Sequence, residues 1–187
     1  KKNLLVTFHP VTLEKNTSSL QMKELLNALQ SLKETNIIFT KPNSDTEGRI
    51  ICKLIDDFVK SNPNRSISFI SMGQVLYLSS LKQVDAIIGN SSSGLIEAPS
   101  FKIGTINIGE RQKGRIFSKS VINCEPKYNS IKRSISKLYS KKFQASLKKV
   151  KNPYGEGGAS QKSFKIIKKI DIEKILKKNF FDLNFKN

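Results

Sequence analysis

The chain has 187 residues, of which 37% are hydrophobic and 26% charged, and this balance excludes an intrinsically disordered protein. No apolar run approaches the roughly 20 residues of a membrane-spanning helix, so no membrane partner is expected. Two cysteines, Cys52 and Cys124, cannot form a disulfide framework, and a single histidine leaves them without partners for a zinc site. We therefore expect no metal, no cofactor and a cytoplasmic location.

The formal net charge of +18 is concentrated in the carboxyl-terminal part of the chain. Residues 111–187 hold 21 of the 33 lysines and arginines but only 5 of the 15 acidic residues. Such a region can attract phosphate polymers or an acidic partner lobe, but lysine side chains that are simply solvated are the favoured interpretation. Only 5 of the cations are arginines, and aromatic side chains do not interleave with a basic stripe. A nucleic acid is therefore not the expected partner.

Short apolar runs alternate with segments of helical periodicity along the chain. The apolar runs predict strands at residues 3–8, 36–40, 66–71, 86–89 and 104–108. Apolar spacings of three or four predict helices over about residues 17–34 and 50–59, with shorter ones at 74–81 and 94–101. Beyond residue 115 the pattern weakens. It still predicts an edge strand at 120–124, a helix at 130–143, a loop at 152–158 and a lysine-rich helix over about residues 163–180.

The alternation of strands and helices predicts an α/β fold with a Rossmann-like parallel sheet. Continuously apolar strands need helices on both faces of the sheet. A sheet of this kind binds ligands beyond the carboxyl ends of its strands. Several polar clusters each follow one of the predicted strands, so we expect them to meet at the same edge of the sheet.

The strongest local signal is the segment Gly89–Pro99, which reads GNSSSGLIEAP and follows the predicted strand at 86–89. Small residues allow backbone N–H groups to approach an anion, and a helix N-terminus adds partial positive charge. Ser91, Ser92, Ser93 and Gly94 could therefore hold a diphosphate, although a serine that only caps the helix is the alternative. Glu97 lies one residue too late for a capping box with Ser93, which leaves its carboxylate available for the two hydroxyls of a ribose.

Three further clusters follow other strands. His9 could donate to a phosphate oxygen or act near neutral pH, whereas most lone histidines are structural. Arg111, in the loop after the strand at 104–108, suits a phosphate or carboxylate, with a solvated basic loop as the alternative. Asn43 could reach a ligand from the loop after the strand at 36–40, where a plain turn fits as well.

Together the motifs resemble the hydrolysing UDP-N-acetylglucosamine 2-epimerases. The resemblance runs in order over about residues 3–180 and includes TFHPVTLE at 7–14, PNSD at 42–45, the segment at 89–99, NIGERQKGR at 107–115 and YGEG at 154–157. Non-hydrolysing members of the wider family carry a His-Arg-Arg-Glu type motif after the first strand of this lobe. Here His9 is followed by Pro10 and Val11, and this difference favours the hydrolysing branch.

The resemblance implies a two-lobed fold of the glycosyltransferase-B type, in which residues 1–187 form the carboxyl-terminal nucleotide-binding lobe. The amino-terminal lobe is then a partner. The apolar side of the helix at about 163–180 packs most simply on this lobe, and docking on the amino-terminal lobe is the alternative. The implied ligand is UDP or a UDP-sugar. The residues that the resemblance places around it are Asn43, Met72, Ser91, Ser92, Ser93, Gly94, Glu97 and Arg111, with His9 catalytically important at the junction of diphosphate and sugar.

The implied reaction eliminates UDP from the sugar nucleotide and adds water with inversion at C2, releasing N-acetylmannosamine for sialic acid-type sugars. Because the catalytic carboxylates of the family lie mainly in the other lobe, this chain is expected to bind UDP without turnover. A 2,4-diacetamido sugar, or another nucleotide, is an alternative substrate. The competing functions are a glycosyltransferase of the same fold and a polyanion-binding module in residues 111–187. A homo-oligomer is compatible with the apolar side of the last helix.

Overall fold

The computed structural model describes residues 1–11, 17–43 and 46–171. These residues divide into two compact units, one over Lys1–Tyr154 and one that begins at Gly155. Every strand of the described chain lies in the first unit, together with all helices except α7. No helix of the described ranges has the length and apolar character needed to cross a membrane. The first unit is therefore the part that carries the predicted sheet.

The sheet has six parallel strands in the order β3-β2-β1-β4-β5-β6. This is the doubly wound strand order, and it confirms the predicted α/β class. The register places Thr40, Thr7, Gly89 and Asn107 side by side across neighbouring strands, so these residues mark the carboxyl edge of the sheet. The strands are β1 (Lys2–Thr7), β2 (Thr35–Thr40), β3 (Ser66–Phe69), β4 (Ala86–Gly89), β5 (Gly104–Ile108) and β6 (Val121–Cys124).

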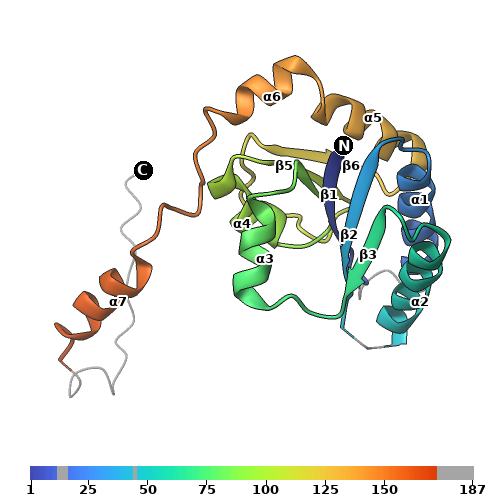
Figure 1. Cartoon of the computed structure of the whole chain (residues 1–187). Coiled ribbons are helices and arrows are strands. Elements are labelled where there is room, and N and C mark those ends of the chain that lie inside the picture. Colours follow the sequence, from blue (N-terminus) through green and yellow to red (C-terminus); the bar gives the residue numbers. More distant parts are fainter. Residues whose placement is uncertain (12–16, 44–45, 172–187) are drawn as a thin grey trace, which may run out of the picture. The chain divides into compact units, whose positions relative to one another are not determined.

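Helices cover both faces of the sheet, as continuously apolar strands require (Figure 1). On one face α1, α2, α5 and α6 bury the larger core, and on the other face α3 and η1 bury a smaller one. The short helix α4 packs against η1 and β5. The helices of the first unit are α1 (Ser18–Gln30), α2 (Thr46–Ser61), α3 (Gly73–Leu81), α4 (Ser93–Ile96), the 3-10 helix η1 (Ala98–Phe101), α5 (Tyr128–Leu138) and α6 (Lys141–Leu147).

Alternation along β1 explains why the chain builds two cores. Leu4 and Val6 belong to the larger cluster, whereas Leu5 belongs to the smaller one, and all three are fully buried. Successive side chains of a strand point to opposite faces, so a continuous apolar run supplies both sides of the sheet. Burying one such aliphatic side chain contributes about 1.5–3 kcal/mol to folding.

Beyond residue 115, two predicted helices differ from the observed ones. The single helix expected at 130–143 is wrong, because α5 ends at Leu138 and α6 begins at Lys141. Ser140 separates them and caps α6, since its Oγ accepts the N–H of Phe143 at 3.3 Å. The helix expected from Ser163 begins earlier, as α7 at Ala159, and ends at Ile167. Residues 168–171 of the predicted helix are not helical, and residues 172–180 lie outside the described residues.

The second unit contains α7 (Ala159–Ile167), which starts after Gly158 in a left-handed conformation. The described apolar side chains of this helix are exposed, with Phe164, Ile166 and Ile167 each more than 60% accessible. A packed helix normally buries its apolar stripe. Docking of this segment on another lobe therefore stays a prediction that is compatible with its exposed side chains.

Gly89 closes β4 with a backbone conformation that other residues rarely adopt, at φ +140°. A Cβ at this position would lie 1.9 Å from the carbonyl oxygen of Thr7 on the neighbouring strand. That same oxygen accepts the N–H of Asn90 at 3.1 Å. Only glycine therefore lets β4 end this close to β1, and the chain then turns so that Asn90 reaches the loop after β1.

We predict that Gly89→Ala lowers the free energy of unfolding by more than about 3 kcal/mol, because the backbone clash adds to the cost of a positive φ. Gly114→Ala is the matched control, since Gly114 also has a positive φ, +82°, but a Cβ added there would meet no atom within 4 Å. That control should cost about 1 kcal/mol. Urea unfolding of both variants measures the difference, and equal losses would contradict the close approach of the two strands.

Candidate functional site

A cavity of about 440 Å³ opens at the carboxyl edge of the sheet. It brings together three of the residues that the sequence predicted around a ligand, His9, Met72 and Glu97. Loops that follow β1, β2 and β3 supply much of its lining, as expected for a doubly wound sheet. The lining residues are Thr7, His9, Thr40, Lys41, Ile70, Ser71, Met72, Gly73, Gln74, Tyr77, Leu78 and Glu97.

Glu97 lies between α4 and η1 and is half-buried. Its Oε2 atom is buried and has no hydrogen-bond partner among the described residues. A buried carboxylate oxygen without a donor is costly, because nothing replaces the water that it has lost. The position therefore suits a ligand that brings its own hydroxyl donors into the cavity.

The serine segment, residues 91–94, is more tightly turned than expected. The helix begins at Ser93 rather than Gly94, and α4 has only 4 residues before η1 continues the chain. A single turn aligns few peptide dipoles, so the predicted charge from a helix N-terminus is a minor contribution here. Binding of an anion at this segment must come mainly from hydroxyl groups, free N–H groups and nearby cations.

The individual residues of the serine segment have distinct contacts. Ser92 occupies the N-cap position but its side chain makes no capping hydrogen bond, so the alternative of a simple serine cap does not apply to it. Ser91 Oγ accepts the N–H of Ser93 at 3.4 Å, and Ser93 Oγ accepts the hydroxyl of Tyr77 at 2.5 Å. Gly94 packs on β5, where an added Cβ would lie 2.5 Å from Thr105 Cγ2.

Asn90 connects three loops of the carboxyl edge and is fully buried. Its Oδ1 accepts the N–H of His9 at 2.7 Å, and its Nδ2 donates to the carbonyl of His9 at 2.8 Å. Its own carbonyl accepts Arg111 Nη1 at 3.1 Å and Gln112 Nε2 at 2.7 Å. One asparagine therefore sets the main chain at His9 and also anchors the loop after β5.

Arg111 reaches this network from an exposed position. Burial of part of its guanidinium, followed by repulsion from Arg115, lowers the pKa of Arg111 from its ordinary value. Neither arginine has an ion-pair partner in the described part of the chain. Since arginine stays protonated at neutral pH, the loop presents uncompensated positive charge next to the serine segment.

Asn43 is not brought into the cavity. It is exposed and follows β2, and the residues after it, Ser44 and Asp45, lie outside the described residues, as do residues 12–14 of the first motif. Lys41 from the same loop does line the cavity, and its Nζ forms an ion pair with Asp56 at 2.6 Å. The prediction for Asn43 therefore has no geometric support in the described structure.

The sequence-based reasoning missed the hydroxyl groups at the cavity and the role of Asn90. Thr7, Thr40 and Tyr77 all line the cavity, and the Oγ1 atoms of Thr7 and Thr40 lie 2.5 Å apart. Thr7 and Thr40 are the last residues of their strands. Because ligands of such sheets bind beyond the carboxyl ends of the strands, the sequence could have indicated both threonines. Tyr77 carries no such signal, because its position depends on how α3 packs against the sheet.

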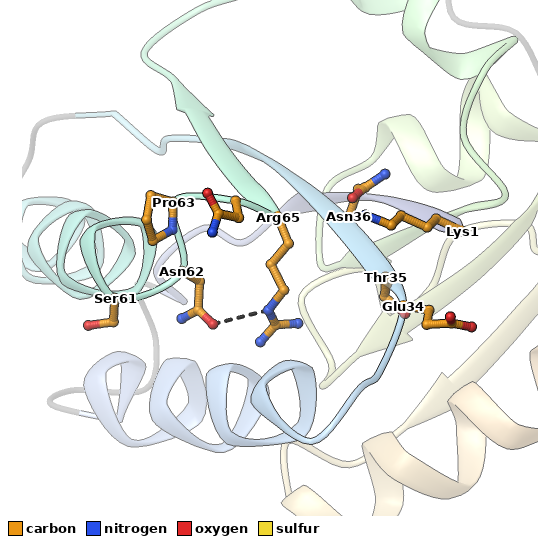
Figure 2. A pocket seen from close by; sticks show the side chains of 9 residues that line it. Lys1, Glu34, Thr35, Asn36, Ser61, Asn62, Pro63 and Arg65 are labelled. Atoms are coloured by element: carbon orange, nitrogen blue, oxygen red, sulfur yellow. Dashed lines mark hydrogen bonds between the residues drawn. The ribbon is translucent and has the colours of Figure 1, made fainter.

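A second hollow, of about 460 Å³, lies at the opposite edge, beside the amino ends of β2 and β3 (Figure 2). Arg65 enters it, but its guanidinium is committed to the protein: Nε donates to Asn62 Oδ1 at 3.0 Å, and Nη1 donates to the carbonyls of Leu29 and Leu32. The two bonds from Nη1 supply donors to main-chain carbonyls at the carboxyl end of α1, where the last carbonyls of a helix lack partners within the helix. The hollow contains none of the predicted ligand residues, so the carboxyl-edge cavity is the better candidate site.

Comparison with known proteins gives the same family as the motifs. A family model described as UDP-N-acetylglucosamine 2-epimerase matches residues 1–168. The chain is 40% identical over 184 residues to a Campylobacter jejuni protein named GDP/UDP-N,N'-diacetylbacillosamine 2-epimerase (hydrolyzing), covering 98% of this chain and 47% of that protein. It is also 40% identical to the Escherichia coli polysialic acid biosynthesis protein P7, covering 90% of this chain and 43% of that protein. The chain thus spans about half the length of these curated relatives.

Solved structures show the same fold. A Staphylococcus aureus MnaA structure with UDP aligns with a TM-score of 0.70 at 15% identity, covering 90% of this chain and 44% of that one. A Methanocaldococcus jannaschii UDP-GlcNAc 2-epimerase aligns with a TM-score of 0.68 at 17% identity, covering 89% and 45%. Acinetobacter baumannii MurG aligns with a TM-score of 0.58, which relates the fold to the glycosyltransferase-B type. With its sequence matched over residues 1–168 and its sheet matched to these structures, the chain belongs to the UDP-N-acetylglucosamine 2-epimerase family.

Proposed function

We propose that the carboxyl-edge cavity binds the nucleoside diphosphate part of a UDP-sugar. The observation that carries this proposal is that Glu97 lines the cavity and that its buried Oε2 atom lacks a donor among the described residues. The 2'- and 3'-hydroxyls of a ribose are two donors on adjacent carbons, and a carboxylate can accept from both. The S. aureus structure with UDP and the family match support a uridine nucleotide as the ligand.

The diphosphate would then lie over the serine segment, between Glu97 and the loop that carries Arg111. Hydroxyl groups at Ser91, Ser92 and Ser93 supply donors, and Arg111 supplies the charge. Charge-assisted hydrogen bonds to phosphate oxygens are about twice as strong as neutral ones. The base would contact the backbone near Met72, which lines the same cavity.

In the whole enzyme this site would serve a hydrolysing 2-epimerase reaction. Elimination breaks the bond between the anomeric carbon and the diphosphate oxygen and removes the C2 proton, and water then adds across the glycal to release the free sugar. The residues of this chain would stabilise the departing diphosphate, with His9 at the junction of diphosphate and sugar. We expect the chain by itself to bind UDP but not to turn over substrate.

The proposed substrate is UDP-N-acetylglucosamine, with N-acetylmannosamine as product for sialic acid-type sugars. The name of the E. coli relative supports such a pathway, whereas the C. jejuni and Legionella pneumophila relatives are named for a diacetylated bacillosamine substrate. Supplying both sugar nucleotides to the whole enzyme and identifying the released sugar distinguishes these substrates. We further propose a cytoplasmic enzyme in which the other lobe contacts this one, with a homo-oligomer as the assembled form.

Glu97→Ala should weaken UDP binding by about 1–3 kcal/mol, roughly 5- to 150-fold in Kd, because it removes the acceptor of the ribose hydroxyls. Isothermal titration calorimetry with UDP and 2'-deoxy-UDP tests this assignment. The wild-type chain should prefer UDP, and Glu97→Ala should bind both ligands equally.

Glu125→Ala is the matched control for that experiment, since Glu125 is an exposed carboxylate paired only with Lys127, at 2.8 Å, in the described structure. It should leave both Kd values unchanged. A Glu97→Ala variant that still prefers UDP over 2'-deoxy-UDP would show that the ribose is recognised elsewhere.

Asn90→Ala should lower the free energy of unfolding by about 2–4 kcal/mol, because it leaves the N–H and carbonyl of His9 without the bonds that the buried amide supplies. It should also weaken UDP binding, since the loop that carries His9 loses its anchor, whereas the main-chain carbonyl at position 90 still accepts from Arg111 and Gln112. Urea unfolding and calorimetry measure the two effects.

Asn36→Ala is the control for Asn90→Ala, because Asn36 Nδ2 donates to Asn3 Oδ1 at 2.9 Å, near the amino ends of the strands and away from the cavity. It should cost no more than about 1 kcal/mol and leave the UDP affinity unchanged. An unaltered UDP affinity in folded Asn90→Ala would contradict the anchoring role of Asn90.

A further inference from the structure

Tyr77 is a hydroxyl-bearing residue of the cavity to which neither the motifs nor the proposed function gives a role. It lies on α3, is half-buried, and lines the cavity with Thr7 and Glu97. Its ring packs against the smaller core cluster, and its hydroxyl donates to Ser93 Oγ on α4 at 2.5 Å. The bond joins two elements that the chain separates by β4, so it depends on the tertiary fold.

The direction of this hydrogen bond determines what Ser93 can do. A serine hydroxyl carries one hydrogen and two acceptor lone pairs. Because Tyr77 supplies the hydrogen of the shared bond, the hydrogen of Ser93 is left for another acceptor. No acceptor for it is found among the residues that the structure describes.

The surroundings of Tyr77 keep its phenol protonated, so that its hydroxyl can donate a hydrogen bond. Burial raises the pKa of its phenol above the ordinary value, the hydrogen bond with Ser93 opposes that rise, and the charge of Glu97 adds to it. The phenol is therefore protonated at neutral pH. Thr7 lines the same cavity, and its Oγ1 hydrogen-bonds to Thr40 Oγ1 across the β1–β2 pair. The hydrogen bond to Ser93 fixes the direction in which the phenolic hydroxyl points.

We propose that Tyr77 is a positioning residue of the nucleotide site, which directs the hydrogen of Ser93 toward an acceptor oxygen of the bound diphosphate. The inference rests on the proposed function, since it needs a diphosphate above the serine segment. It assigns Tyr77 an indirect role, because the hydrogen of its own hydroxyl is already used within the protein. The site would then favour ligands that present acceptor oxygens at this point.

A double-mutant cycle with two ligands tests the proposal. Tyr77→Phe, Ser93→Ala and the double variant are titrated with UDP and with uridine, which lacks the diphosphate, and Kd is measured by ligand-observed NMR. Tyr77→Phe should weaken UDP binding about 3- to 10-fold, the scale of one neutral hydrogen bond, and should leave uridine binding unchanged. In the Ser93→Ala background, Tyr77→Phe should change the UDP Kd by less than about twofold.

Tyr139→Phe is the matched control, since the buried hydroxyl of Tyr139 makes no hydrogen bond in the described structure. It should leave both Kd values unchanged. Additive losses of Tyr77→Phe and Ser93→Ala, an equal loss for uridine, or no loss at all would each overturn the proposal. Failure of the wild-type chain to bind UDP would instead refute the proposed function and this inference with it, so the two failures are distinguishable.

Discussion

The close approach of β4 to β1 is the constraint on which the rest of the site depends. At Gly89 the absence of a side chain allows the carbonyl of Thr7 to accept the N–H of Asn90. The buried amide of Asn90 then holds the main chain of His9 on one side, and its carbonyl holds Arg111 and Gln112 on the other. Residues 89–90 thus fix the positions of three loops at the carboxyl edge, and the serine segment comes directly after these residues in the chain.

This arrangement gives the site a particular electrostatic character. The single-turn α4 contributes little dipole, so hydroxyl groups and the loop of Arg111 provide the attraction for an anion, while Glu97 provides the acceptor for a sugar ring. The large basic excess of residues 111–187 is a separate property. Its lysines are largely exposed where the structure describes them, and the one lysine that lines the cavity is Lys41, which is paired with Asp56.

The sequence alone predicted the strands and their common edge. Continuously apolar runs, such as those at 86–89 and 104–108, identify buried strands without knowledge of the tertiary structure. His9, Met72 and Glu97 do line one cavity, although their roles toward a ligand stay predictions. The sequence failed to predict the contact of Tyr77 with Ser93, because that contact depends on tertiary packing. The one-turn length of α4 and the break at Ser140 were also not predicted, although the break is local, since Ser140 caps α6 through the N–H of Phe143. The role of Asn90 was not predicted, because the role of a buried asparagine becomes clear only when the loops that its side chain connects are known.

In our proposal the carboxyl edge, and not the hollow at the other edge, receives the nucleotide. Backbone amide chemical shifts of the 187-residue chain, recorded by ¹⁵N NMR during titration with UDP, test it most directly. We predict the largest changes at Asn90–Glu97, with further changes near Met72 and Arg111, and none around Arg65. Changes centred on Arg65 and the amino ends of β2 and β3, with the serine segment unaffected, would contradict it.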